Sequence, residues 1–282
     1  MPIHKIKSYA KINLSLRVLG KLQSKLHKIE SLISFIDLHD EILIKKIKSN
    51  KHNVIFFGKF SKNIPKYNTV TKLLNILDKK KILKNQKYLI KINKKIPLKS
   101  GMGGGSMNAS SILRHFINKK NFHLKNHLII KIANEIGSDV MIGLKRKNSI
   151  LQGNGQIFRL SKKIGLYVII IKPNFGCSTK KIYTKIKFFS KPILNKRNNK
   201  LFNKDKLINL TNDLERVAFK LYPKLSIIKK NMLNLPNVQF VRMTGSGSSL
   251  IGYFNSKKAS LNAVKILKRK HRNYWCILSK TI

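Results

Sequence analysis

Residues 97–110 constrain this 282-residue sequence most, because they place four glycines and a serine directly before a helical pattern. Glycine allows main-chain turns closed to other residues and brings amide N–H groups close to an anion. From Asn108 onward apolar residues recur at helical spacing, so we expect Ser106 to cap a helix whose positive end points at the loop. With a strand predicted over 88–92, the order of strand, loop and helix predicts a pocket for phosphate.

The spacing of this loop excludes the two common nucleotide-binding patterns. No Gly-Lys-Ser or Gly-Lys-Thr closes the loop, and no Gly-x-Gly-x-x-Gly is followed by an acidic residue about 20 positions later. An isolated stretch of glycine and serine is also typical of a plain flexible turn. The flanking strand and helix favour a phosphate-binding loop of a different family.

The charge balance is extreme, with 60 lysines and arginines against 10 acidic residues and a formal net charge of +50. Such a balance suggests nucleic-acid binding. However, the lysines are spread along the whole chain, and no set of aromatic residues is interleaved with them to stack on bases. We favour a compositional bias toward solvated lysines, whose field would still attract anionic substrates.

The length allows two modest domains or one large one with a substantial core. The two cysteines, Cys177 and Cys276, form neither a disulfide framework nor a metal-ligand spacing, which favours a reducing, cytoplasmic location. The strongest apolar run, 166–171, has the length of a strand, so we expect no membrane span. Lysines interrupt the N-terminal hydrophobic pattern, and we expect no secretory signal.

Because acids are scarce, the candidates for a general base are few. Asp139 stands out, since it follows a helix predicted over 124–136 that Gly137 ends. His27 lies on a loop predicted at 24–27 and, taken alone, is typical of an ordinary surface histidine.

The remaining patterns mix strands and helices without strict alternation, which indicates an α+β fold. A second glycine-rich turn at 244–249 is placed to brace the first one from another domain. The other predicted elements are strands at 8–18, 33–38, 40–47, 167–171 and near 274–278, a hairpin at 150–158, helices at 70–76, 213–234 with a break at Pro223, and 261–267, and an exposed loop at 185–206.

Three separated segments together resemble the GHMP family of small-molecule kinases: Ala10-Lys-Ile-Asn-Leu14, the loop with Gly103-Gly-Gly-Ser106, and Met243-Thr-Gly-Ser-Gly247. The resemblance extends from the first residues nearly to the last. It includes Phe35-Ile-Asp37, Asn68, Gly137-Ser-Asp-Val140 and Asn212-Asp-Leu-Glu215. The first segment is specific to the branch that acts on a cytidine-diphosphate-linked methylerythritol.

The resemblance implies a two-domain, α+β, GHMP-kinase-like fold with the active site in the inter-domain cleft. The expected domains are an ATP-binding domain at 1–160, with the phosphate loop, and a C-terminal GHMP-kinase domain at 161–282. The implied reaction moves the γ-phosphate of ATP, with Mg²⁺, to the 2-hydroxyl of that methylerythritol compound in non-mevalonate isoprenoid synthesis. We expect a monomer or homodimer with a small-molecule substrate and no metal site of its own, no specific nucleic acid and no membrane.

The resemblance also implies roles for individual residues. Asp139 matches the catalytic aspartate and Lys11 its partner, a pairing in which a carboxylate accepts the hydroxyl proton beside an ammonium. Implied substrate ligands are Asn13, His27, Thr179 and Tyr183, with the histidine reading the cytosine and the tyrosine stacking on it. The expected ATP-binding residues are Pro97, Leu98, Lys99, Ser100, Gly101, Met102, Gly103, Gly104, Gly105, Ser106 and Met107.

Some positions depart from the family. Ser24-Lys-Leu26 stands where the family has Asp-Gly-Tyr, which removes one half of the expected aromatic sandwich around cytosine. Two alternatives stay open. One is a sister kinase that acts on mevalonate-like or homoserine-like alcohols, and the other is a basic nucleic-acid-binding protein on a kinase-like scaffold.

Overall fold

The protein divides into two compact units in a computed structural model that describes residues 2–23, 26–118, 124–194 and 199–282. Unit 1 comprises Met1–Ala10, Leu38–Pro97 and Gly103–Arg146, and unit 2 comprises Lys11–Asp37, Leu98–Met102 and Lys147–Ile282. The units are not contiguous in sequence because the long strands β1 (Ile3–Lys21) and β2 (His27–Ile47) contribute residues to both. The expected domain boundary between residues 160 and 161 would instead divide the chain at a single point, and it stays a prediction.

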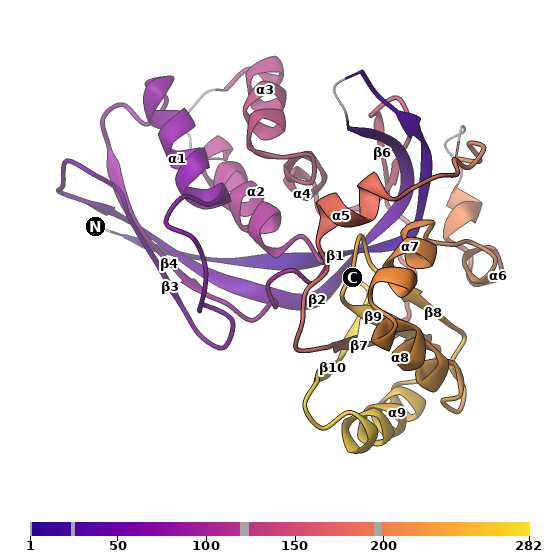
Figure 1. Cartoon of the computed structure of the whole chain (residues 1–282). Coiled ribbons are helices and arrows are strands. Elements are labelled where there is room, and N and C mark those ends of the chain that lie inside the picture. The colour runs from indigo at the N-terminus through magenta and orange to yellow at the C-terminus, as the bar shows by residue number, and fades with distance from the viewer. Residues whose placement is uncertain (1, 24–25, 119–123, 195–198) are drawn as a thin grey trace. The chain divides into compact units, whose positions relative to one another are not determined.

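Unit 1 is a layer of helices against a sheet. The C-terminal part of β2 pairs antiparallel with β4 (Lys87–Asn93), and β3 (Asn53–Phe57) pairs parallel with β4. The helices lie together on one side of these strands in Figure 1. They are α1 (Thr69–Lys79), α2 (Gly104–Ile117), α3 (Asn126–Ile136) and α4 (Val140–Leu144).

Alternation of apolar and polar residues builds the core of unit 1. In β4 the alternate residues Tyr88, Ile90 and Ile92 are buried, and helical spacing brings Leu73 of α1 and Phe116 of α2 into the same cluster. A capping box begins α1, since the Asn68 side chain accepts from the amides of residues 70 and 71 while the hydroxyl of residue 71 accepts from the Asn68 amide.

Unit 2 contains an antiparallel four-stranded sheet in the order β10-β7-β9-β8, against which α8 and α9 pack (Figure 1). Its other strands, β5 and β6, extend the N-terminal part of β2. The elements are β5 (Asn148–Leu151), β6 (Ile157–Leu160), β7 (Tyr167–Lys172), α5 (Thr179–Thr184), the 3₁₀ helix η1 (Asn199–Phe202), α6 (Lys204–Ile208), α7 (Leu214–Leu221), α8 (Lys224–Leu233), β8 (Phe240–Met243), β9 (Leu250–Phe254), α9 (Lys257–Lys270) and β10 (Trp275–Lys280).

Most predicted elements are confirmed, including the hairpin of β5 and β6 and the break between α7 and α8 at Pro223. The two strands predicted at 33–38 and 40–47 are one strand, β2. The loop predicted at 185–206 is wrong at its end, which contains η1 and α6, and residues 195–198 lie outside the described residues. No helix in the described part of the chain is long and apolar enough to cross a membrane.

Ser106 is not the N-cap of α2, contrary to the prediction. The helix begins three residues earlier because Gly103, with a φ of +67°, caps it through the main chain. The Gly103 carbonyl accepts from the amide of Met107 at 2.8 Å, which is already a helical hydrogen bond. Ser106 therefore lies within the first turn.

Candidate active site

Two of the three segments that resemble the GHMP family, at Lys11–Leu14 and Met243–Gly247, meet within unit 2 the residues that lead into the third, Leu98–Met102. The Thr244 hydroxyl donates to the carbonyl of Gly101 at 3.2 Å and accepts from the amide of Asn13 at 3.0 Å. The amide of Lys11 donates to the carbonyl of Met102 at 3.2 Å. One threonine thus joins the N-terminal strand, the first glycine turn and the second glycine turn.

The second glycine turn braces the first, as the sequence predicted, although the bracing residues belong to one compact unit. The amides of Ser248 and Ser249 donate to the carbonyls of Lys99 and Ser100 at 3.3 and 3.4 Å. A Cβ on Gly101 would lie 2.0 Å from the carbonyl oxygen of Thr244, and its φ is +75°. Only glycine fits at this crossing.

The family segment Asn212–Glu215 holds the second glycine turn in place. The Asn212 amide nitrogen donates to the carbonyls of Met243 and Gly245, both at 2.8 Å. The Glu215 carboxylate accepts from the amide of Met243 at 2.6 Å. These contacts order the turn.

Lys11 is a buried lysine, and only 5% of its surface is exposed. Its ammonium donates to the side-chain oxygen of Asn13 at 2.8 Å, and the nitrogen of that amide donates to the Ser31 hydroxyl at 2.8 Å. A buried ammonium needs such partners, since an uncompensated buried charge is unstable. Lys11 is therefore held in one place, unlike the many surface lysines of this chain.

Side chains do not cap the start of α2, whose first amides follow the first glycine turn. Gly104 approaches Lys94 so closely that an added Cβ would lie 3.4 Å from its ammonium. Lys94 is buried and paired with buried Asp40, whose other oxygen accepts from the amides of Lys95 and Ile96 at 2.7 and 2.9 Å. Asp40 thus fixes the chain just before the loop and holds the Lys94 ammonium beside α2.

The expected ATP-binding residues differ in what they can offer. The side chains of Pro97, Ser100, Met102 and Met107 are buried, whereas Lys99 and Gly105 are exposed and Leu98, Gly101, Gly103, Gly104 and Ser106 are half-buried. The Thr69 hydroxyl donates to the carbonyl of Gly105 at 2.8 Å. An anion would therefore meet mainly main-chain groups here.

Asp139 lies in unit 1 as the half-buried N-cap residue of α4, where Gly137 ends α3 as predicted. Lys11 belongs to unit 2. The convergence of Asp139 and Lys11 on one substrate atom stays a prediction.

Two of the four expected substrate ligands form a ring pair within unit 2. The rings of His27 and Tyr183 have centroids 4.9 Å apart at an interplanar angle of 41°. The Nε2 of His27 is buried and has no hydrogen-bond partner among the described residues. Burial, together with the nearby positive charge of Lys21, lowers the pKa of His27 below its usual value, so the ring is neutral at pH 7.

The other expected ligands lie nearby along the chain. Asn13 holds Lys11, as described above, and Thr179 at the start of α5 shares a hydrogen bond of 2.7 Å with Ser246 of the second glycine turn. Leu26, where the family has tyrosine, is 67% exposed. Ser24 and Lys25, the rest of that departure, lie outside the described residues.

Two residues that hold these segments, Lys94 and Thr244, do not stand out in the sequence. Lys94 is one lysine among very many, and only its burial against Asp40 distinguishes it. Thr244 lies inside a family segment, but the two hydrogen bonds of its hydroxyl involve residues more than 140 positions away. No group of three histidine, cysteine or acidic side chains that could hold a metal ion occurs in the described part of the chain.

Models of the N-terminal and C-terminal domains of GHMP kinases match residues 68–146 and 191–273. The chain belongs to the GHMP kinase family and is a small-molecule kinase.

The chain is 57% identical, over 99% of both lengths, to the 4-diphosphocytidyl-2-C-methyl-D-erythritol kinase of Pelagibacter ubique. Its fold is similar to a crystal structure of 4-(cytidine 5'-diphospho)-2C-methyl-D-erythritol kinase, with a TM-score of 0.79 and 20% identity over 98% of this chain and 99% of that one. It is also similar to homoserine kinase from Cytophaga hutchinsonii, with a TM-score of 0.70 and 16% identity over 100% and 95%. The predicted α+β fold of the GHMP kinases is confirmed.

Proposed function

We propose that this kinase transfers the γ-phosphate of ATP to the 2-hydroxyl of 4-diphosphocytidyl-2-C-methyl-D-erythritol, a step of non-mevalonate isoprenoid synthesis. The relative from Pelagibacter ubique has the name of that enzyme, and the similarity extends over 99% of both chains. Within the family, the observation that carries the choice of substrate is the His27–Tyr183 pair, with its unsatisfied ring nitrogen. A nucleobase offers both a flat face to stack and an edge to hydrogen-bond.

On the nucleotide side, residues 97–107 would bind the phosphates of ATP through the amides of the glycine turn and of the first turn of α2. This arrangement suits an anion because the helix end is positive and no side chain caps it. The buried side chains of Pro97, Met102 and Met107 would fix the loop by packing in the protein interior. Mg²⁺ would enter with ATP, since it is usually bound by substrate phosphates and few carboxylates, and would supply charge neutralisation.

On the acceptor side, Asp139 would take the proton of the 2-hydroxyl as the oxygen bonds to the γ-phosphorus and ADP leaves. Lys11, held by Asn13, would orient the same oxygen and keep the carboxylate ionised. General-base assistance of this kind contributes on the order of 10²- to 10⁴-fold in rate. Positioning and electrostatic stabilisation of the phosphates would supply the rest.

At the cytidine end, the neutral His27 would share a hydrogen bond with the edge of cytosine while Tyr183 stacks on its face. Asn13 and Thr179 would contact the remainder of the substrate. The free, buried state of Cys177 and Cys276 supports a cytoplasmic location. A monomer or homodimer stays our prediction of the oligomeric state.

The test is ADP formation by the purified protein with ATP, Mg²⁺ and a panel of acceptors: the cytidyl methylerythritol, mevalonate and homoserine. We expect turnover with the cytidyl compound alone. Faster turnover of mevalonate or homoserine would instead identify a sister kinase. Absence of ADP with every acceptor, together with sequence-selective nucleic-acid binding at near-physiological salt, would favour the scaffold alternative.

A further inference from the structure

The chain that follows α5 forms a tethered segment, residues 186–194, which we call the strap. It begins three residues after Tyr183 and has no helix or strand of its own. Both of its ends are buried, at Ile186 and Leu194, and Ile186 packs in the hydrophobic core of unit 2. Between them Phe188, Phe189 and Ile193 are exposed, so apolar packing does not set the course of the middle of the strap.

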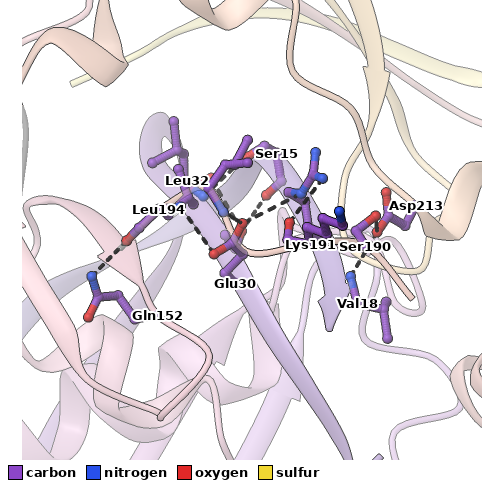
Figure 2. A network of polar contacts seen from close by, with 12 residues as sticks. Ser15, Val18, Glu30, Leu32, Gln152, Ser190, Lys191, Leu194 and Asp213 are labelled. Atoms are coloured by element: carbon purple, nitrogen blue, oxygen red, sulfur yellow. Dashed lines mark hydrogen bonds and ion pairs between the residues drawn. The ribbon is translucent and has the colours of Figure 1, made fainter. Parts of the chain in front are cut away.

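The first polar tether of the strap is at the edge of β1. The amide of Ser190 donates to the carbonyl of Val18 at 2.8 Å, as a neighbouring strand would. One oxygen of Asp213 accepts both from the amide of Val18 and from the Ser190 hydroxyl, each at 2.8 Å (Figure 2). Asp213 therefore satisfies the strand edge and fixes Ser190 to it.

The second tether is Glu30, a carboxylate of β2 that is 1% exposed. Its two oxygens accept from the amides of Ile193 and Leu194 at 2.8 and 3.2 Å (Figure 2). A buried carboxylate is costly unless it is fully hydrogen-bonded, and these two bonds use both of its oxygens.

Two long side chains add to this tether. The Nε of Arg17 lies 3.5 Å from the Oε1 of Glu30, and the guanidinium of Arg17 also donates to the carbonyl of Lys191 at 3.1 Å. Gln152 donates to the carbonyl of Leu194 at 2.6 Å (Figure 2). The far end of the strap is therefore bound through backbone groups, which hold the path of the chain independently of its side chains.

Glu30 and His27 lie three residues apart on one strand, and the strap leads directly back to Tyr183. The strand that carries the histidine of the ring pair therefore also anchors the segment that follows the tyrosine. We propose that Glu30 is a positioning residue for nucleobase recognition, which sets the Tyr183 ring opposite His27 by clamping the strap. This inference rests on the proposed function, in which that pair binds a pyrimidine base.

The test compares Glu30→Gln with Glu41→Gln in the full chain. The Glu30→Gln variant keeps the side-chain volume but turns an NH₂ group toward one of the two strap amides. Glu41 lies on the same strand, is exposed, and bonds Lys95 and Asn93 instead of the strap. Hydrogen exchange at the amides of Ile193 and Leu194 reports release of the strap, and calorimetric titration with CDP reports base recognition.

For Glu30→Gln we expect exchange at both amides to accelerate about 10-fold or more, and the Kd for CDP and the KM for the cytidyl substrate to rise about 10-fold, which is the scale of one lost stacking contact. The KM for ATP and kcat should change less than about 2-fold, and Glu41→Gln should change none of these values. Ser190→Ala removes one hydrogen bond of the first tether and should raise the Kd for CDP by a smaller factor. This variant replaces Glu30→Gln as the test if Glu30→Gln does not fold.

Equal losses of affinity for CDP and ATP would mean general destabilisation and would overturn the proposal. Unchanged CDP affinity with a released strap would overturn it as well. A wild-type protein that binds no CDP would contradict the proposed function itself. Equal CDP affinity in the wild type and in the Glu30→Gln variant would contradict only this inference.

Discussion

Replacing Gly101 by alanine should separate the two glycine turns. A Cβ at this position would lie 2.0 Å from the carbonyl oxygen and 2.9 Å from the carbonyl carbon of Thr244. The turns would have to part by more than about 1 Å to reach ordinary contact distance. That movement would break the three hydrogen bonds between residues 99–101 and 244–249.

The size of the effect follows from two contributions. Alanine at a positive φ costs about 1–2 kcal/mol. Three hydrogen bonds at about 0.5–1.5 kcal/mol each raise the loss in unfolding free energy to about 3–6 kcal/mol. Because the carbonyl of Met102 accepts from the amide of Lys11, the shift should also lower kcat/KM by about 100-fold, as a misplacement of about 1 Å does.

Gly165→Ala is the matched control for this prediction. Gly165 has a φ of +70°, close to that of Gly101, but nothing lies within 4 Å of an added Cβ. This variant should lose only about 1–2 kcal/mol and keep its kcat/KM. The assays are urea unfolding and steady-state kinetics. Equal losses in the two variants would mean that strain at a positive φ, and not separation of the two turns, causes the effect.

The remaining predictions concern chemistry, recognition and pH. Asp139→Asn should lower kcat by about 10²- to 10⁴-fold with an unchanged circular dichroism spectrum, and adding Lys11→Met should cost little more, because the two groups act together in the proposed mechanism; additive losses would show independent roles. Tyr183→Leu should raise the KM for the cytidyl substrate about 10-fold, from the loss of about 1–3 kcal/mol of stacking, without changing the KM for ATP; a parallel rise in both would contradict base stacking. Burial lowers the pKa of His52, whose Nδ1 accepts from the amide of Tyr88. In the unfolded chain His52 has its usual pKa of 6.5, so near that pH the unfolded chain binds more protons than the folded protein does. The free energy of unfolding should therefore fall as the pH drops through that value. Urea unfolding at pH 5 to 8 should show this slope, and His52→Gln should lessen it; an equal slope in the variant would assign it to another group.

Local sequence patterns predicted well those helices and strands that local sequence alone determines. The strand at 88–92, the helices around 70–76 and 261–267 and the hairpin at 150–158 are set by alternation, helical spacing and glycine turns. The start of α2 was misplaced because serine is the better N-cap by side chain, whereas Gly103 caps through its own left-handed backbone. The strands predicted at 33–38 and 40–47 are one continuous strand, and Asp40 at their junction has its carboxylate satisfied by Lys94 and two amides.

The site could be predicted in part, because family segments identify residues but not their partners. The sequence placed both glycine turns and Lys11 in one site, and the hydrogen bonds of Thr244 and Met102 join these segments. The anchoring role of Glu30 could not be read from the sequence, since its partners are main-chain amides 163 and 164 residues away. Backbone donors leave no trace in composition or spacing, so the sequence predicted the exposed loop at the strap but not its anchoring.

The most direct test of the proposed reaction is the position of the transferred phosphate. Phosphorus NMR of the product formed from ATP and the cytidyl methylerythritol should show a new phosphomonoester on the tertiary 2-hydroxyl, with one ADP released for each product. The Asp139→Asn variant should form it at least about 100-fold more slowly. A phosphate on another hydroxyl, or unchanged turnover by that variant, would contradict the account.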